Sequence, residues 1–76
     1  MTTLQALKPG DRARVVGFDD ADSAYARQLL SLGLIPGTVL AVERVAPLGD
    51  PVEIGFRGMH LALRPHEAGT LTLEKL

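Results

Sequence analysis

The sequence predicts a mainly β fold, a small SH3-like β-barrel of about five strands with one short α-helix. In several short runs, apolar and polar residues alternate between turns that contain Gly and Pro. One stretch, residues 23–32, instead repeats its apolar residues at three- and four-residue spacing, as one face of a helix does. A chain of 76 residues is too short for a two-sheet sandwich, so we expect one partly open barrel.

Composition limits the classes of function that remain. We expect residues 1–76 to form a single domain whose core comes from the 46% hydrophobic residues, because the chain has no cysteine for a disulfide or a thiolate metal site. Eight basic and nine acidic residues are interspersed, which gives no basic patch for nucleic acid. There is neither a signal-peptide pattern nor an uncharged run of about 20 residues. We therefore expect a protein that binds no nucleic acid and does not insert into a membrane.

The predicted helix is followed by a turn that leads into a strand over residues 38–45. Ser23 closes a polar, Asp-rich segment and is a favourable helix N-cap. Gly33 comes where a helix can end on a residue with positive φ, which glycine adopts without steric cost. Pro36 and Gly37 suit the two central positions of a type II turn.

A second turn of the same kind comes earlier in the chain. Leu7-Lys8-Pro9-Gly10 matches Leu34-Ile35-Pro36-Gly37 as Leu-x-Pro-Gly, and each precedes an alternating run, residues 11–18 in the first case. Gly10 and Gly37 are therefore expected to supply positive φ at equivalent places. Recurring turn chemistry explains this match better than an internal repeat does.

The clearest local prediction is a β-hairpin. Arg57 and Gly58 can form a two-residue turn between strands over residues 52–56 and 59–64. The resulting cross-strand pairs are Phe56 with Met59, Ile54 with Leu61, and Val52 with Leu63. Because side chains alternate along a strand, all six would share the face that covers the core. A last strand over residues 70–76 completes the expected five.

Two connections offer apolar residues for a partner. Small barrels bind partners through exposed loops, and here Leu34 and Ile35 follow the helix while Leu48 lies in the Pro- and Gly-rich loop over residues 46–51. Together with Arg27, these residues are predicted to form a partner-binding surface at one end of the barrel. The alternative is that the leucines, Leu34 above all, close the barrel end from inside.

His60, His66 and Glu67 are the candidate metal ligands, because imidazole and carboxylate groups bind Zn²⁺ and, less tightly, Fe²⁺. With only two histidines in the chain, we expect no resident cofactor. A transition-metal ion, physiological or adventitious, is the alternative.

The sequence shows no catalytic pattern. It has no P-loop glycines, no Ser-His-Asp set and no cysteine nucleophile, so we expect no enzyme activity. An arginine donated to the GTPase of a partner is chemically possible, and Arg27, Arg57 and Arg64 are the expected exposed choices. The other interpretation is that each is a solvated surface charge.

The order and spacing of these motifs resemble one known family. Leu7-Lys8-Pro9-Gly10, the helix leading into residues 29–37, the loop 46–51 and the segment 57–68 together look like FeoA, ferrous iron transport protein A. The resemblance implies an SH3-like fold and a cytosolic regulator of FeoB, a membrane ferrous iron transporter with a GTPase domain. FeoA-like domains also occur in metal-dependent repressors, so a stand-alone metal-sensing module is the alternative function. An open barrel edge would also permit self-association.

Overall fold

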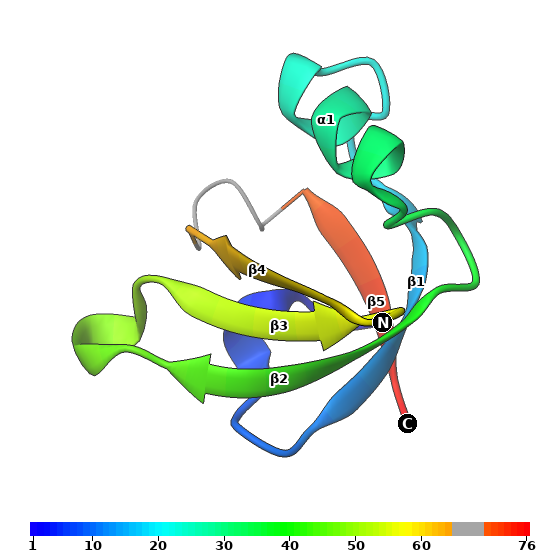
Figure 1. Ribbon diagram of the computed structural model, residues 1–76. Helices are drawn as coiled ribbons and strands as arrows, with labels where there is room; N and C mark the ends of the chain where they lie inside the picture. The colour runs from blue at the N-terminus through cyan, green and yellow to red at the C-terminus, as the bar shows by residue number, and fades with distance from the viewer. Residues whose placement is uncertain (65–69) are drawn as a thin grey trace.

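The structure is a computed structural model that describes residues 1–64 and 70–76. Within these residues the strands form one antiparallel sheet in the order β4-β3-β2-β1-β5 (Figure 1). This confirms the predicted mainly β fold with five strands and one short α-helix. In chain order the elements are η1 (Leu4–Ala6), β1 (Arg12–Phe18), α1 (Ala24–Leu32), β2 (Val39–Val45), η2 (Pro47–Gly49), β3 (Val52–Phe56), β4 (Met59–Leu63) and β5 (Leu71–Lys75).

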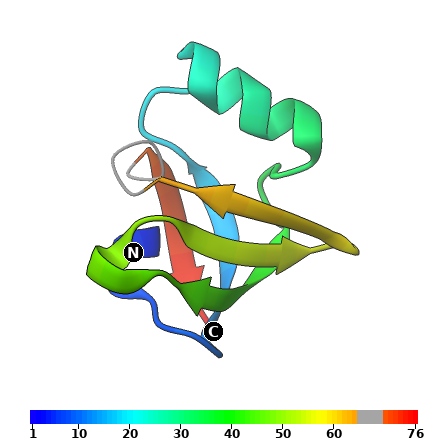
Figure 2. The ribbon, with the colours of Figure 1, turned by 60° about the vertical axis from the view of Figure 1, so that its left-hand side comes forward.

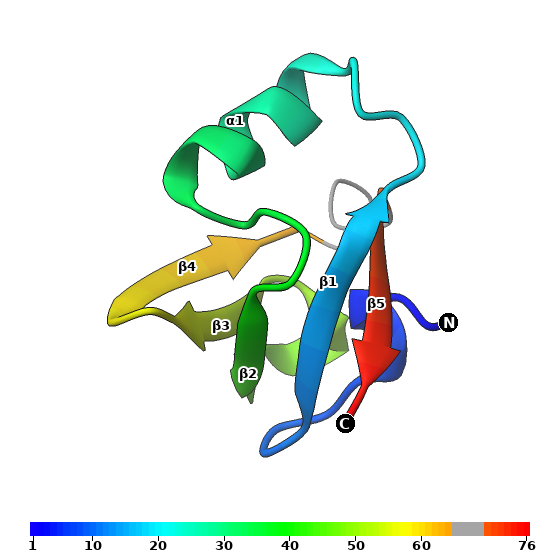
Figure 3. The same cartoon turned by 90° about the vertical axis from the view of Figure 1, so that its right-hand side faces the viewer.

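The sheet curls into a partly open barrel. In Figure 3, β3 and β4 run across the direction of β1 and β5, and α1 lies over one end of the curled sheet, as Figure 2 also shows. Two β-bulges assist this curvature: the pairing of β1 with β5 skips Val16, and the pairing of β2 with β3 skips Glu43. A bulge bends its strand and increases the local twist, so both are expected where a short sheet must close on itself.

The core contains the inward-facing residues of all five strands, together with apolar residues of η1, of α1 and of the turns that follow them. The alternation predicted for each strand is confirmed, apart from the bulged positions and from Met59. That residue was predicted to cover the core but keeps 38% of its surface exposed, because it lies at the hairpin end of the edge strand β4. The buried cluster comprises Leu4, Leu7, Ala13, Val15, Leu29, Leu34, Leu40, Val42, Val52, Ile54, Phe56, Leu63, Leu71 and Leu73.

The β3–β4 hairpin has the predicted register, from Phe56 opposite Met59 to Val52 opposite Leu63. Arg57 and Gly58 have φ values of 50° and 79°. Positive φ at both central positions is what a type I′ turn requires, and this turn matches the right-handed twist of the flanking strands.

Helix α1 begins and ends as predicted. The Ser23 side chain accepts a hydrogen bond from the Ala26 amide at 3.0 Å, and Gly33 ends the helix in the left-handed region with φ 107°. At nine residues, α1 is short. In the part of the chain that the structure describes, no helix has the length and apolarity needed to cross a membrane.

Both Leu-x-Pro-Gly segments form the predicted turns. The Thr38 amide donates to the Ile35 carbonyl at 3.0 Å, and Gly37 has φ 94°. In the earlier turn Gly10 has φ 92°, and the corresponding hydrogen bond is 2.9 Å long. The two strand entries therefore share one type of turn, with glycine at the position that needs positive φ.

Candidate functional site

The predicted docking residues differ in how much of their side chains is exposed. Ile35 keeps 40% of its surface exposed, and Leu48 is fully exposed. Arg27 is exposed on α1. Leu34, in contrast, has no exposed surface, so the prediction of an exposed docking side chain is wrong for this residue.

The way α1 ends explains the burial of Leu34. The Leu34 amide donates to the Leu29 carbonyl at 3.0 Å, and the Gly33 amide donates to the Leu30 carbonyl at 3.1 Å. This pair of hydrogen bonds defines a Schellman motif, which turns the residue after the glycine back toward the last turn of the helix. Leu34 and Leu29 both lie in the core cluster as a result. The alternative interpretation, that Leu34 closes the barrel end, is therefore the correct one.

Ile35 and Leu48 do not form one surface, because they lie at opposite ends of β2. The turn that contains Ile35 leads into Val39, the first residue of β2, whereas Leu48 follows Val45, the last one. Seven residues of strand separate the two ends by about 20 Å. Figure 1 shows the two connections on opposite sides of the molecule. The prediction that both loops contribute to one docking end is wrong.

Leu48 is held outside the core in an unfavourable backbone conformation. Its φ of 68° and ψ of 11° are left-handed, a conformation that costs a non-glycine residue about 1 to 2 kcal/mol. The side chain borders a hollow of about 310 Å³, whose apolar lining includes Leu7, Val45 and Val52. We call these four residues the Leu48 hollow. No packing within the described residues accounts for a fully exposed leucine here, so the hollow is a candidate contact surface.

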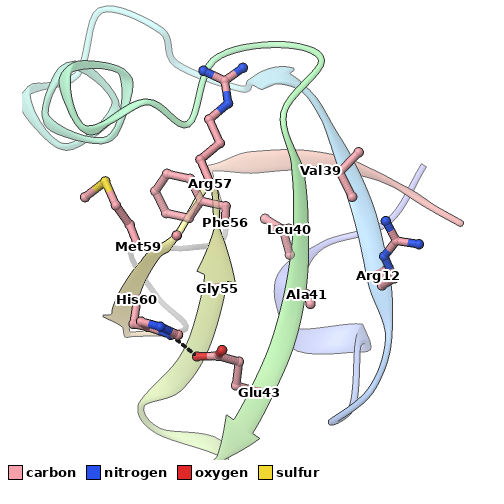
Figure 4. A pocket seen from close by; sticks show the side chains of 11 residues that line it. Arg12, Val39, Leu40, Ala41, Glu43, Gly55, Phe56, Arg57, Met59 and His60 are labelled. Carbon is pink, nitrogen blue, oxygen red and sulfur yellow. Dashed lines mark hydrogen bonds and ion pairs between the residues drawn. The ribbon is translucent and has the colours of Figure 1, made fainter.

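A second candidate site is a cleft of about 370 Å³ on the outer face of β2, β3 and β4 (Figure 4). His60 Nδ1 on β4 lies 2.8 Å from Glu43 Oε1 on β2. Figure 4 shows this pair at one side of the cleft, with the guanidinium groups of Arg57 and Arg12 at other rims. We call this surface the outer-face cleft, and it is lined by Arg12, Val39, Leu40, Ala41, Glu43, Gly55, Phe56, Arg57, Gly58, Met59 and His60.

Two backbone features bring Glu43 to His60. Glu43 is the extra residue of the β2 bulge, between the pairs that Val42 and Arg44 make with β3. Gly55 lies on the strand between Glu43 and His60, and a Cβ atom there would come 2.6 Å from Glu43 Oε2. Because the carboxylate is the end of a flexible side chain, a Cβ atom at position 55 would displace it from this position, and glycine leaves that space free.

Glu43 was not among the residues predicted from the sequence, although a signal for its position was present. Leu40 and Val42 face inward, so strict alternation would also place Arg44 in the core. An arginine at an inward position is costly to bury, and a bulge before it resolves the conflict by shifting the phase of the strand. Arg44 is exposed as a result, next to Glu43, the residue that the pairing with β3 skips.

The three arginines considered for a partner's GTPase have different surroundings. Arg64 Nη1 lies 3.4 Å from Asp50 Oδ1. Within residues 1–64 and 70–76, Arg27 and Arg57 make no ion pair. Arg57 lies at the tip of the β3–β4 hairpin, and Arg27 is exposed on α1. These two guanidinium groups are therefore more accessible to a partner protein than that of Arg64.

Of the predicted metal ligands, His60 is described, whereas His66 and Glu67 lie outside the described residues. Among the residues that are described, no group of three or more His, Cys, Asp or Glu side chains could hold a metal ion. The described neighbour of His60 is Glu43, a residue that was not among the predicted ligands.

The curled five-stranded sheet, with a short helix over one end, defines a small SH3-like domain. The chain belongs to the FeoA family, because the family model of the FeoA domain matches residues 2–75. The resemblance drawn from the sequence motifs is thereby confirmed.

Two solved structures support both the fold and the family. The FeoA protein of Chlorobium tepidum is 44% identical, with a TM-score of 0.88 over 99% of this chain and 70% of that one. The zinc complex of Stenotrophomonas maltophilia FeoA is 28% identical, with a TM-score of 0.85 over 97% of this chain and 91% of that one. That protein is described as a prokaryotic SH3 domain protein possibly acting as a ferrous iron transport activating factor.

A further relative joins two proteins in one chain. The Fe(2+) transport protein A/Fe(2+) transporter FeoB fusion protein of Porphyromonas gingivalis is 28% identical over 71 residues. The match covers 93% of the present chain and only 8% of the length of the fusion protein.

Proposed function

We propose that this protein is a cytoplasmic accessory protein that docks on a FeoB-type membrane transporter of ferrous iron and modulates its transport or GTPase activity. It carries out no chemistry of its own. The fusion relative is the observation that supports this proposal most, since it joins an FeoA-like segment to a FeoB transporter in one chain. A covalent link holds two modules at high effective concentration, which is useful when one acts on the other.

The Leu48 hollow is the docking contact in this proposal. A fully exposed leucine gains about 1.5 to 3 kcal/mol when a partner buries it completely. That gain corresponds to roughly 10- to 100-fold in affinity. The left-handed backbone at Leu48 keeps the side chain outside before binding, so a partner meets it already positioned. Ile35 and Arg27 offer a second contact, separate from the hollow.

A co-purification experiment tests the proposal. The tagged protein is mixed with the transporter's isolated GTPase domain and, separately, with the full-length transporter in detergent. Each mixture is prepared with and without a non-hydrolysable GTP analogue and with and without Fe²⁺. We expect capture of the full-length transporter without added metal. Failure in every arm would contradict docking, and capture only in the presence of Fe²⁺ would favour the alternative function of metal sensing.

A rate measurement separates docking from modulation. The GTPase rate and the iron uptake of the reconstituted transporter are measured while the protein is added in increasing amounts. A saturable change in either rate is expected at the concentrations at which capture occurs. Capture without any change in either rate would leave the protein as a docked component only and would refute its regulatory role.

A further inference from the structure

We propose that Glu43 and His60 together bind a divalent first-row transition-metal ion, such as Zn²⁺ or Fe²⁺. The two side chains come from β2 and β4 and meet over Gly55 of the intervening strand (Figure 4). The proposal concerns the outer-face cleft and does not depend on docking through the Leu48 hollow.

The two donor atoms are already close to the separation that a chelated metal requires. His60 Nδ1 and Glu43 Oε1 are 2.8 Å apart. Zn²⁺ bound at about 2.1 Å to each donor, with an angle of about 90 to 110° between them, would hold the atoms about 3.0 to 3.4 Å apart. A small outward rotation of either side chain therefore admits the ion. The hydrogen between the two atoms would leave to solvent when the metal binds.

The backbone next to the Glu43–His60 pair departs from regular strand structure in two places. A bulge disrupts the β2–β3 pairing at Glu43, and glycine within a strand loses packing and conformational entropy. Both features lie on the outer face, and Gly55 leaves the space that Glu43 Oε2 occupies. The bulge and the glycine thus permit one carboxylate to lie beside one imidazole.

Exposure permits water molecules to complete the coordination shell. The side chains of His60 and Glu43 are 72% and 39% exposed. Arg12 and Arg57 line the same cleft, and their charges oppose a cation. In Figure 4 both guanidinium groups lie away from the Glu43–His60 pair, at other rims. Solvent screens charges at such positions, so the arginines limit the affinity without blocking the site.

The test is a titration of the whole protein with Zn²⁺ alone and, under anaerobic conditions, with Fe²⁺ alone. Calorimetry gives the affinity, and amide and imidazole NMR shifts give the location. We expect one saturable site at sub-millimolar metal, with shifts centred on Glu43, Gly55 and His60. His60→Ala and Glu43→Gln are each expected to weaken the affinity at least tenfold. Unchanged amide spectra away from the cleft would show that both variants remain folded.

Three further variants make the result specific. His66→Ala removes the other histidine, and Glu53→Gln removes a carboxylate of the neighbouring strand, so both are expected to leave the affinity unchanged. Arg57→Gln is expected to increase the affinity about two- to fivefold, because a like charge leaves the cleft. The proposal would be overturned by the absence of saturable binding. Equal affinity in His60→Ala, or loss of binding in His66→Ala instead, would overturn it as well.

Discussion

Replacing Leu34 with alanine tests whether this residue belongs to the core or to a docking surface. Leu34 has no exposed surface and belongs to the core cluster. Truncation of a fully buried leucine costs about 3 kcal/mol, which is a large part of the roughly 4 to 11 kcal/mol expected for a domain of this length. Alanine keeps the amide that donates to the Leu29 carbonyl, so the variant isolates the contribution of the side chain.

Urea and thermal unfolding measure this effect, with Ile35→Ala as the matched control. The two residues are adjacent, but Ile35 keeps 40% of its surface exposed, so its truncation should cost about 1 kcal/mol. For Leu34→Ala, a loss of 3 kcal/mol corresponds to a decrease in Tm of about 12 to 24 °C. Equal losses in the two variants, at unchanged denaturant m-values, would refute the assignment of Leu34 to the core.

Substitutions at three further positions test the helix ends and the exposure of Leu48. Ser23→Ala should lower the free energy of unfolding by about 1 kcal/mol, because the Ala26 amide loses its partner; an unchanged urea midpoint would contradict the cap. Gly33→Ala should lower the free energy of unfolding by about 1 to 2 kcal/mol, because alanine is strained at the φ of 107° that this position adopts. The added Cβ would lie 3.6 Å from Phe56, so no steric clash contributes to this loss. Gly33→Asn should recover part of that loss, and equal stability of the two variants would argue against backbone strain. Leu48→Asn should leave stability within about 0.5 kcal/mol, because the side chain is exposed and asparagine tolerates left-handed φ; a larger loss would mean that Leu48 packs within the protein.

Local patterns predicted the elements that depend on local chemistry. The β3–β4 register follows from the pairing of apolar residues around Arg57 and Gly58, because a shift of one residue would move the apolar set to solvent. The helix end at Gly33 and the turn at Gly37 follow from the same kind of argument, since both need positive φ.

The candidate sites depend on three-dimensional context that local patterns do not carry. Leu34 follows a helix-ending glycine, and only the Schellman hydrogen bonds show that its side chain turns inward. Ile35 and Leu48 both occur in loops, but the sequence does not reveal that β2 separates them. Glu43 was missed because its position depends on a bulge and on Gly55, which is 12 residues further along the chain and lies on another strand. The position of Leu48 in a loop correctly predicted that its side chain is exposed. It did not predict that Leu48 lies far from Ile35.

Docking is tested by the affinity of this protein for a full-length FeoB-type transporter in nanodiscs. It is measured for the unaltered chain and for two variants, Leu48→Asn and Ile35→Asn, after both have been shown to remain folded. We expect saturable binding that Leu48→Asn weakens at least tenfold, whereas Ile35→Asn changes it less. Binding that is unaffected by Leu48→Asn would contradict the proposed contact, and absence of binding by the unaltered chain would contradict docking itself.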